Sequence, residues 1–224
     1  MIYAPIEKSE DWRRFLADPD KQWREGYSAH ALAHSWQDAA GFPREIKLLF
    51  ESSSELHKIE PLLVLPEHKV SLPGGSRPSQ NDVWVLAKVE QELVSITIEG
   101  KVAETFGPTV SEWSTAASLG KTERLAYLCK KIGLSEPCPG DVRYQLLHRT
   151  ASALIEAERF LAANAVMLIH SFGTTQEGFA DYRYFAKLLG VNAEPGKLSY
   201  VGHLNGIQLY IGWASGDPVA KSVL

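Results

Sequence analysis

The stretch NDVWVLAKVEQELVSITIEGK, residues 81–101, constrains the fold most, because it predicts two antiparallel strands joined by a tight turn. Side chains alternate between the two faces of a strand, so each strand has one aliphatic face that belongs in a core. With the turn centred between Glu90 and Gln91, the core-facing residues pair across the hairpin as follows: Val83 with Ile98, Val85 with Ile96, and Ala87 with Val94.

The opposite face of this hairpin carries Asp82, Glu99 and Lys101. Two carboxylates that converge raise each other's pKa unless a cation lies between them. A hard divalent cation such as Mg²⁺ or Mn²⁺ would relieve that repulsion, since it prefers carboxylate and water oxygens, and it can activate a bound water. A neighbouring lysine would orient that water and stabilise the charge that develops on a phosphate. The hairpin therefore predicts a metal-dependent hydrolytic site.

The order of elements along the chain predicts an α/β fold in which a mixed central sheet is flanked by helices, because a hairpin requires antiparallel pairing whereas strand–helix–strand units favour parallel pairing. We expect a single domain over residues 1–224, with a core over about 25–172 and a C-terminal helix–strand extension over 173–224. The predicted helices cover residues 25–40, 121–134, 144–162 and 179–190, and the predicted strands or strand-like arms cover 45–52, 59–72, the hairpin, 165–173 and 206–214.

Three features together resemble the PD-(D/E)XK phosphodiesterase superfamily, whose core has the order αβββαβ. They are Asp82 at the start of the first hairpin strand, the Glu-x-Lys spacing of Glu99 and Lys101 on the second, and the order of the elements. The resemblance implies that Asp82 and Glu99 bind the metal ion and that Lys101 is the catalytic lysine. Asn81 replaces the proline of the motif, at a position that does not bind the metal. GYSAH, residues 26–30, is similar to the Gly-x-x-x-His motif of the RecB-like branch, which implies His30 as a further metal ligand.

QLLHR, residues 145–149, begins like the Gln-x-x-x-Tyr motif of that branch, with Arg149 at the tyrosine position. Gln145, His148 and Arg149 have helical spacing that places them on one face, from which Arg149 would clamp a phosphate with its planar guanidinium. We therefore expect Gln145 and Arg149 to bind substrate. A structural alternative stays open, in which Arg149 pairs with Glu156 or another acid and His148 is a half-buried histidine whose hydrogen bonds are satisfied.

Two other classes of function stay open beside the nuclease. The first is a noncatalytic binding or interaction protein on the same nuclease-like scaffold. The second is a serine hydrolase, because IHSFG places Ser171 between a strand and a helix, followed in hydrolase order by Asp181 and His203. Against it, Ile169 stands where the tight turn at a nucleophile needs a small residue.

Composition narrows the partners and the compartment. A net charge of −4 argues against coating nucleic acid by bulk electrostatics, but it leaves room for a local nucleic-acid site. The chain has no apolar run of membrane-spanning length and no basic segment followed by an apolar one near residue 1. We therefore expect a cytoplasmic protein that does not contact membranes, with Cys129 and Cys138 as reduced thiols. The sequence leaves its oligomeric state open.

Overall fold

A computed structural model describes residues 6–39, 41–116, 118–173 and 176–216. The helices are the 3-10 helix η1 (Ser9–Phe15) and the α-helices α1 (Pro19–Gln22), α2 (Ser28–Asp38), α3 (Arg44–Glu51), α4 (Val110–Ser114), α5 (Leu119–Ile132), α6 (Tyr144–Arg159) and α7 (Gln176–Leu188). The strands are β1 (Glu60–Val70), β2 (Ser79–Val89), β3 (Glu92–Lys101), β4 (Asn164–Ser171), β5 (Leu198–Leu204) and β6 (Ile207–Ser215).

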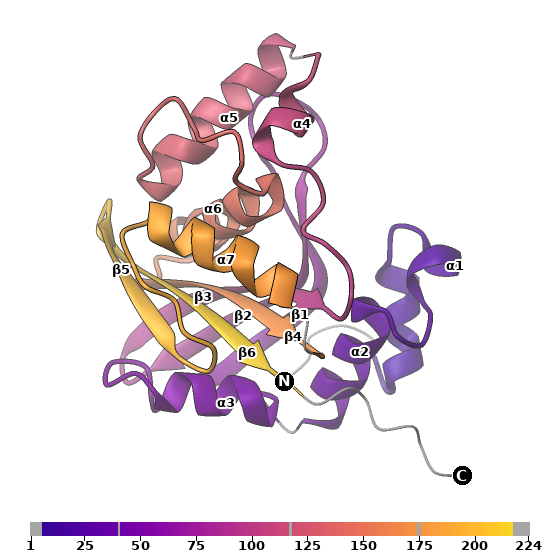
Figure 1. Ribbon diagram of the computed structural model, residues 1–224. Helices are drawn as coiled ribbons and strands as arrows, with labels where there is room; N and C mark the ends of the chain where they lie inside the picture. The colour runs from indigo at the N-terminus through magenta and orange to yellow at the C-terminus, as the bar shows by residue number, and fades with distance from the viewer. Residues whose placement is uncertain (1–5, 40, 117, 174–175, 217–224) are drawn as a thin grey trace.

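All six strands form one mixed sheet in the order β1-β2-β3-β4-β6-β5 (Figure 1). The first three strands form an antiparallel meander, β4 runs parallel to both β3 and β6, and β5 is antiparallel to β6. The predicted α/β class and mixed sheet are thus confirmed. The connection from β3 to β4 contains α4, α5 and α6, and this long crossover allows the parallel pairing of the two central strands.

The hairpin has the predicted register, with Val83 opposite Ile98, Val85 opposite Ile96 and Ala87 opposite Val94. The two-residue turn at Glu90 and Gln91 sets this register, because a turn of fixed length leaves no freedom for the strands to slide. The charged residues of the hairpin therefore share the face that was predicted for them.

Helices cover both faces of the sheet. In Figure 1, α2 and α3 lie on one side and α6 and α7 lie on the other. Trp36 of α2 and Phe50 of α3 belong to a buried cluster with the aliphatic face of the hairpin, whereas Leu146 of α6 and Phe185 of α7 belong to a second cluster on the opposite face. The charged face of the hairpin is therefore covered by a helix, where a surface hairpin would leave it to solvent.

Several elements differ from the sequence prediction, which did not include the short helices η1, α1 and α4. Residues 45–52 are helical, not strand-like: Ile46, Leu49 and Phe50 are buried at helical spacing, and Pro43 precedes the first turn. The C-terminal extension contains a strand that was not predicted, β5, because its sequence LSYVGHL lacks an apolar alternation and its residues are at most partly buried. This strand forms one edge of the sheet.

The other edge of the sheet is β1, which contains Pro61 and Pro66. Proline lacks the N–H group that pairs strands, so prolines are tolerated mainly on edge strands. The pairing of β1 with β2 is also interrupted by a register shift between Pro61 and Leu63.

The centre of the sheet touches α2 at Gly100, the residue between Glu99 and Lys101. A Cβ atom at this position would lie only 2.3 Å from Leu32 Cδ1 and 3.2 Å from Ser28 Cβ. The missing side chain therefore allows α2 to pack directly on β3. This contact fixes the helix beside the charged residues of the hairpin.

Candidate functional site

Three acidic residues lie in a row across neighbouring strands. The pairs Pro66–Val83 and His68–Asn81 flank Glu67 and so place it opposite Asp82. In the same way, continuation of the β2–β3 register beyond Val83–Ile98 places Asp82 opposite Glu99. Directly opposed residues on a sheet have side chains close enough to interact, and like charges there are destabilising. The repulsion among these three carboxylates must therefore be offset by nearby cations or by protonation.

Lys101 supplies one of the cations, from the end of β3. Its Nζ atom donates to Glu99 Oε1 at 2.8 Å and to Gln145 Oε1 at 3.1 Å, and Gln145 Nε2 donates to Glu99 Oε1 at 2.6 Å. The three side chains therefore form a closed triangle of hydrogen bonds. Because Lys101 and Glu99 are almost fully buried, this triangle fixes the ammonium group in position.

Arg149 supplies the second cation, from the side of α6 that faces the sheet. Its Nε donates a hydrogen bond to Glu99 Oε2, and its Nη2 lies 3.7 Å from Asp82 Oδ1. Its Nη1 donates to Ser79 Oγ at 3.2 Å. The guanidinium thus lies between two acids of the row, and α6 is tied to β2 and β3 through it.

The three acids differ strongly in their electrostatics. Burial, followed by repulsion from Glu99, raises the pKa of Asp82 to about 7, although Arg149 and Lys101 oppose this shift. Burial, followed by repulsion from Asp82, raises the pKa of Glu67 to about 8. Burial also favours the protonated form of Glu99, but Arg149 and Lys101 outweigh it, so the pKa of Glu99 lies below its usual value. Glu99 is therefore the acid that both cations neutralise, whereas Asp82 only shares the guanidinium of Arg149 and keeps a raised pKa, as Glu67 does.

These residues line one cleft of about 380 Å³, the acidic cleft. Asp82 also accepts a hydrogen bond at 2.8 Å from the Gly100 amide, which holds its carboxylate near the C-terminal end of β3. The other side chains of the lining come from the N-terminal segments and from the neighbouring strands and helices: Ala17, Gln22, Tyr27, Ser28, Ala29, Gln80 and Glu104.

The structure brings together five of the side chains that were predicted for the site: Asp82, Glu99, Lys101, Gln145 and Arg149 all line the acidic cleft. The structural alternative for Arg149 is met in its general form, because the guanidinium pairs with two other acids, Glu99 and Asp82. Glu156 is not its partner and pairs with Arg159. His148 matches its structural alternative, because its Nδ1 lies 2.8 Å from Ser79 Oγ.

His30 is not in the lining of the cleft, although its neighbours Ser28 and Ala29 are. Its ring instead packs against Trp23 and His34, with ring centroids 5.2 and 4.5 Å apart. The helical turn of α2 thus directs residue 30 away from the strand ends. The predicted metal-binding role of His30 has no support in this geometry.

The serine hydrolase arrangement does not form in the described residues. Ser171 is fully buried at the end of β4 and donates to the Gly173 carbonyl at 3.3 Å. Asp181 forms an ion pair with Arg143 at 2.8 Å, and His203 lies on the edge strand β5. Ser171 is therefore a structural strand-end residue.

Glu67 is the main site residue that the sequence did not reveal. Its φ of 54° interrupts the alternation of β1, so the strand pattern gives no indication of the face that it occupies. Gln80 Nε2 donates to Glu67 Oε2 at 2.6 Å and holds the carboxylate in the cleft. The only signal was an acid directly after the apolar run PLLVLP, residues 61–66.

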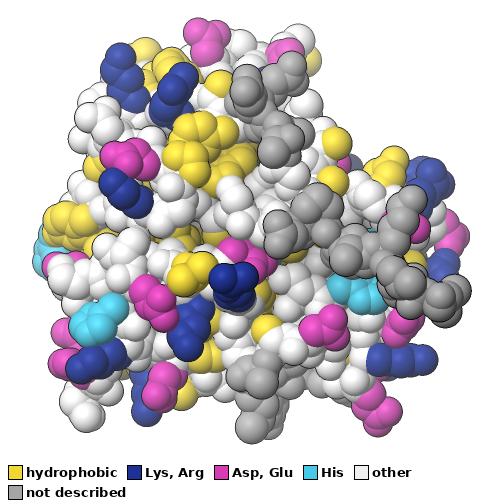
Figure 2. All heavy atoms as spheres, turned by 60° about the horizontal axis from the view of Figure 1, so that its bottom comes forward, with side chains coloured by type: hydrophobic (Ala, Val, Ile, Leu, Met, Phe, Trp, Pro, Cys, Tyr) yellow, Lys and Arg dark blue, Asp and Glu magenta, His cyan; other side chains and the backbone are white. Residues whose placement is uncertain are grey.

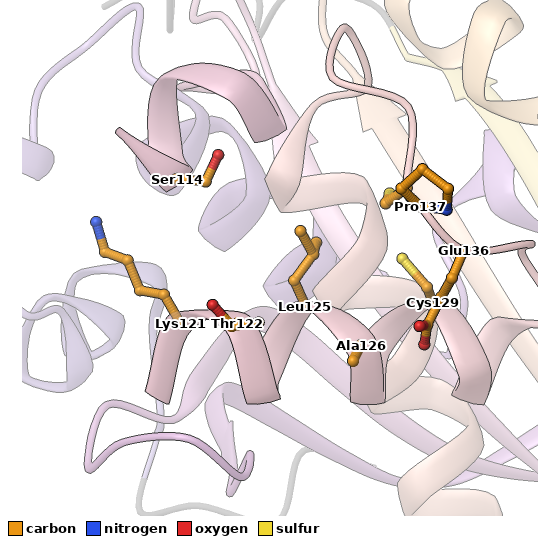
Figure 3. Close-up of a pocket in the computed structure, with 9 residues that line it drawn as sticks. Ser114, Lys121, Thr122, Leu125, Ala126, Cys129, Glu136 and Pro137 are labelled. Atoms are coloured by element: carbon orange, nitrogen blue, oxygen red, sulfur yellow. The ribbon is translucent and has the colours of Figure 1, made fainter. Parts of the chain in front are cut away.

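A separate hollow of about 220 Å³ lies along α5 and shares no lining residue with the acidic cleft (Figure 3). Figure 3 shows Leu125, Ala126 and Cys129 on the helix, with Glu136 and Pro137 across the hollow. Cys129 is buried and Cys138 is half-buried, and both are free thiols. The hollow offers mainly apolar groups and none of the paired acids that mark the acidic cleft.

The surface of the molecule carries mixed charges. On the face that Figure 2 presents, acidic and basic side chains are interspersed and do not form a single-sign field. Such a surface does not attract polyanions by bulk electrostatics, so any nucleic-acid contact depends on local groups.

In the described part of the chain, no helix has both the length and the apolar character needed to cross a bilayer.

Comparison with known proteins assigns the chain to a family but not to an activity. A family model described as a domain of unknown function, DUF6946, matches residues 5–218, and the chain belongs to this family. No curated protein and no solved structure matches it. The geometry of the acidic cleft therefore carries the functional argument.

Proposed function

We propose that this protein is a metal-dependent phosphodiesterase that cleaves nucleic acid, built on a core that resembles the PD-(D/E)XK nucleases. One observation carries the proposal: Asp82, Glu99 and Lys101 converge in one cleft with Gln145 of α6. The element order is compatible with it if α3, α4 and α5 are additions to the αβββαβ core, since α2, β1, β2, β3, α6 and β4 otherwise follow one another. The free thiols of Cys129 and Cys138 fit the reducing cytoplasm as the compartment.

The donor set of the cleft fits a hard divalent cation such as Mg²⁺ or Mn²⁺, with a change in the expected ligands. No three histidine, cysteine, aspartate or glutamate side chains within the described residues are grouped so that they could hold a metal ion. Glu99 is already bonded at both oxygens by Lys101, Gln145 and Arg149. Glu67 and Asp82 are the carboxylates without a full counter-charge, and Mg²⁺ often uses only one or two carboxylates and keeps several waters.

We therefore assign metal binding to Asp82 and Glu67, and we assign Glu99 to the positioning of Lys101 and Gln145. When bound, the ion would lower the pKa of a coordinated water and so supply a nucleophile near neutral pH. Lys101 is held by two hydrogen bonds and would stabilise the charge that develops on the phosphate. Arg149, which borders the same cleft, would fix a phosphate oxygen through its remaining N–H groups.

A noncatalytic nucleic-acid-binding protein on the same scaffold is the second candidate, and Arg149 favours it. The guanidinium lies between Asp82 and Glu99 and neutralises acids that would otherwise face a metal ion. In such a protein the guanidinium of Arg149 takes the place of the metal ion, and the cleft binds nucleic acid without cleaving it.

Titration calorimetry with Mn²⁺ and a cleavage assay separate these candidates. For the phosphodiesterase we expect millimolar or tighter Mn²⁺ binding that Asp82→Asn and Glu67→Gln weaken and that Asp141→Asn, at an exposed position outside the cleft, leaves unchanged. Cleavage of a mixed single- and double-stranded substrate should require Mg²⁺ or Mn²⁺ and stop when EDTA is added. Wild-type protein that binds no Mn²⁺ at millimolar concentration would leave the noncatalytic candidate as the better account.

A further inference from the structure

A second cavity adjoins the acidic cleft and shares two residues with it. This aromatic cavity has a volume of about 290 Å³ and is lined by Lys101 and Gln145 together with residues of the loop 105–108 and of the first turns of α6. Lys101 and Gln145 therefore form the wall between the two hollows. A ligand with a phosphate at Lys101 could extend a neighbouring group into the aromatic cavity.

The side of this cavity formed by α6 is a rigid aromatic surface. The Tyr144 ring lines the cavity, and the Trp113 ring stacks on it with centroids 4.0 Å apart and planes 10° from parallel. Trp113 is not part of the lining, so it supports Tyr144 from behind. The His148 ring also packs beside Tyr144, with centroids 5.0 Å apart and planes 51° apart. Because Tyr144 is also largely buried, its ring is held in a fixed plane before any ligand arrives.

The loop side of the cavity provides its opening, and the Phe106 ring lies buried behind Lys101. Phe106 is fully buried, and Lys101 Nζ lies 5.0 Å from its ring centroid. Thr105 and Gly107, on either side of it, are exposed and form the rim. A flat apolar group can therefore enter past the rim, while a negatively charged phosphate attached to it stays beside the ammonium of Lys101.

The cavity also offers a polar contact for the edge of a flat ligand. His148 lines it, and the Nδ1 atom of this residue is already engaged with Ser79 Oγ at 2.8 Å. A ligand edge would therefore meet Nε2. One fixed hydrogen-bonding atom beside an aromatic plane suits a heterocycle better than an aliphatic chain.

We propose that the aromatic cavity binds one unpaired nucleobase of the substrate strand, next to the phosphodiester that occupies the acidic cleft. This inference rests on the proposed action on nucleic acid and narrows the substrate to single strands or to unpaired, single-stranded ends and loops. Bases of an intact duplex are stacked and paired, so they cannot enter a closed pocket without leaving the helix. Stacking on an aromatic side chain is independent of sequence, because every base has a flat face.

Binding measurements without metal test the cavity separately from the chemistry. The probes are a fluorescein-labelled ten-nucleotide oligothymidylate and a labelled blunt duplex of twenty base pairs, followed by fluorescence anisotropy in EDTA. We expect the wild type to bind the single strand at least about 10-fold more tightly than the duplex, which corresponds to about one stacked base. Thr105→Trp, which fills the cavity from its exposed rim, should remove this preference, whereas Glu123→Trp on the exposed face of α5 should keep it.

Tyr144→Leu provides a second variant that removes the aromatic face and keeps a side chain in place. It should weaken single-strand binding about 10-fold while duplex binding stays unchanged. Equal binding of the two probes by the wild type, or an unchanged preference in both cavity variants, overturns the inference. If metal-dependent cleavage is nevertheless observed, the proposed function stands and only the nucleobase cavity fails; if the preference is observed without cleavage, the cavity stands and the phosphodiesterase fails.

Discussion

Arg149 and Glu99 form a buried ion pair between α6 and the centre of the sheet, with side chains only 7% and 4% exposed. A buried ion of this kind needs its partner, because an isolated charge in the interior costs several kcal/mol. The pair joins segments that are fifty residues apart and is continued by Lys101 and Asp82. The predictions below follow from this network and from the contacts that surround it.

Arg149→Met should destabilise the protein by about 3 kcal/mol, because it leaves part of the buried charge of Glu99 without a partner. Urea unfolding followed by circular dichroism measures this change. Arg159→Met is the matched control, since its ion pair with Glu156 lies on a side chain that is 65% exposed, and we expect it to cost less than about 1 kcal/mol. Equal effects of the two substitutions would contradict a structural role for the buried pair.

The free energy of unfolding of the wild type should decrease as the pH rises from about 4 to the raised pKa values of Asp82 and Glu67, about 7 and about 8. Over this range the folded state holds a proton that the unfolded chain has already released, so the stabilisation is complete at low pH and is fully lost once the folded carboxyl has ionised. Asp82→Asn should remove part of this slope and stabilise the protein at pH 9 by up to about 1 kcal/mol. Thermal unfolding from pH 5 to pH 9 measures the slope. An identical pH profile in wild type and Asp82→Asn would show that Asp82 does not titrate abnormally.

If the protein has the proposed phosphodiesterase activity, Lys101→Met should lower it by about 100-fold or more, because the ammonium group proposed to stabilise the developing charge is lost. Mn²⁺ affinity measured by calorimetry should stay close to that of the wild type, since an ammonium group does not ligate a metal ion. Lys88→Met is the control, because Lys88 is 46% exposed and pairs with Glu60 away from the cleft. Unfolding curves must accompany both variants, because only a folded Lys101→Met protein tests the catalytic assignment. A folded variant with wild-type activity would exclude it.

His170, unlike Asp82 and Glu67, should make the free energy of unfolding fall at the acidic end of the pH range. His170 is fully buried, and its Nδ1 accepts a hydrogen bond from the Trp36 indole at 3.3 Å. The neutral ring therefore carries its proton on Nε2, which lies 2.6 Å from Glu45 Oε1. Burial lowers the pKa of His170 despite the opposing effect of Glu45. The lowered pKa means that the unfolded chain takes up the proton first, so this stabilisation is complete above about pH 6.5 and is lost as the pH falls below it. Nitrogen NMR of the ring should report the Nε2–H form at pH 7, and the Nδ1–H form would contradict the assignment.

Gly100→Ala should destabilise the protein by about 1–3 kcal/mol, because the added methyl group overlaps the buried side chain of Leu32. Combining it with Leu32→Ala should cost less than the sum of the two single substitutions, since the smaller side chain makes room for the methyl group. Chemical denaturation of the four proteins of this cycle measures the coupling. Strict additivity would mean that α2 does not pack on Gly100 as described.

The sequence was sufficient for the hairpin and for the residues that it presents. A turn of two residues fixes the register, and alternation then decides that Asp82, Glu99 and Lys101 share a face. Helical spacing likewise brought Gln145 and Arg149 together. Each of these inferences used a periodicity within one element or one tight turn.

Other features depended on relations that no local pattern contains. Glu67 comes to face Asp82 through a register that the long loop 71–78 does not specify. The pairing of Arg149 with Glu99 depends on how α6 crosses the sheet, and Coulomb attraction alone could have joined Arg149 to another acid. Residues 45–52 are short and apolar at both helical and strand spacing, so tertiary packing decided between the two.

The prolines of β1 have a consequence for how molecules of this protein meet one another at high concentration. An open sheet edge invites a strand from a second molecule, because unsatisfied amide groups there can extend the ladder and begin a fibril. Pro61 and Pro66 interrupt the run of amide hydrogens along β1, and the irregular pairing near Pro61 distorts the edge further. The molecule therefore carries within its first strand a safeguard against self-templated aggregation.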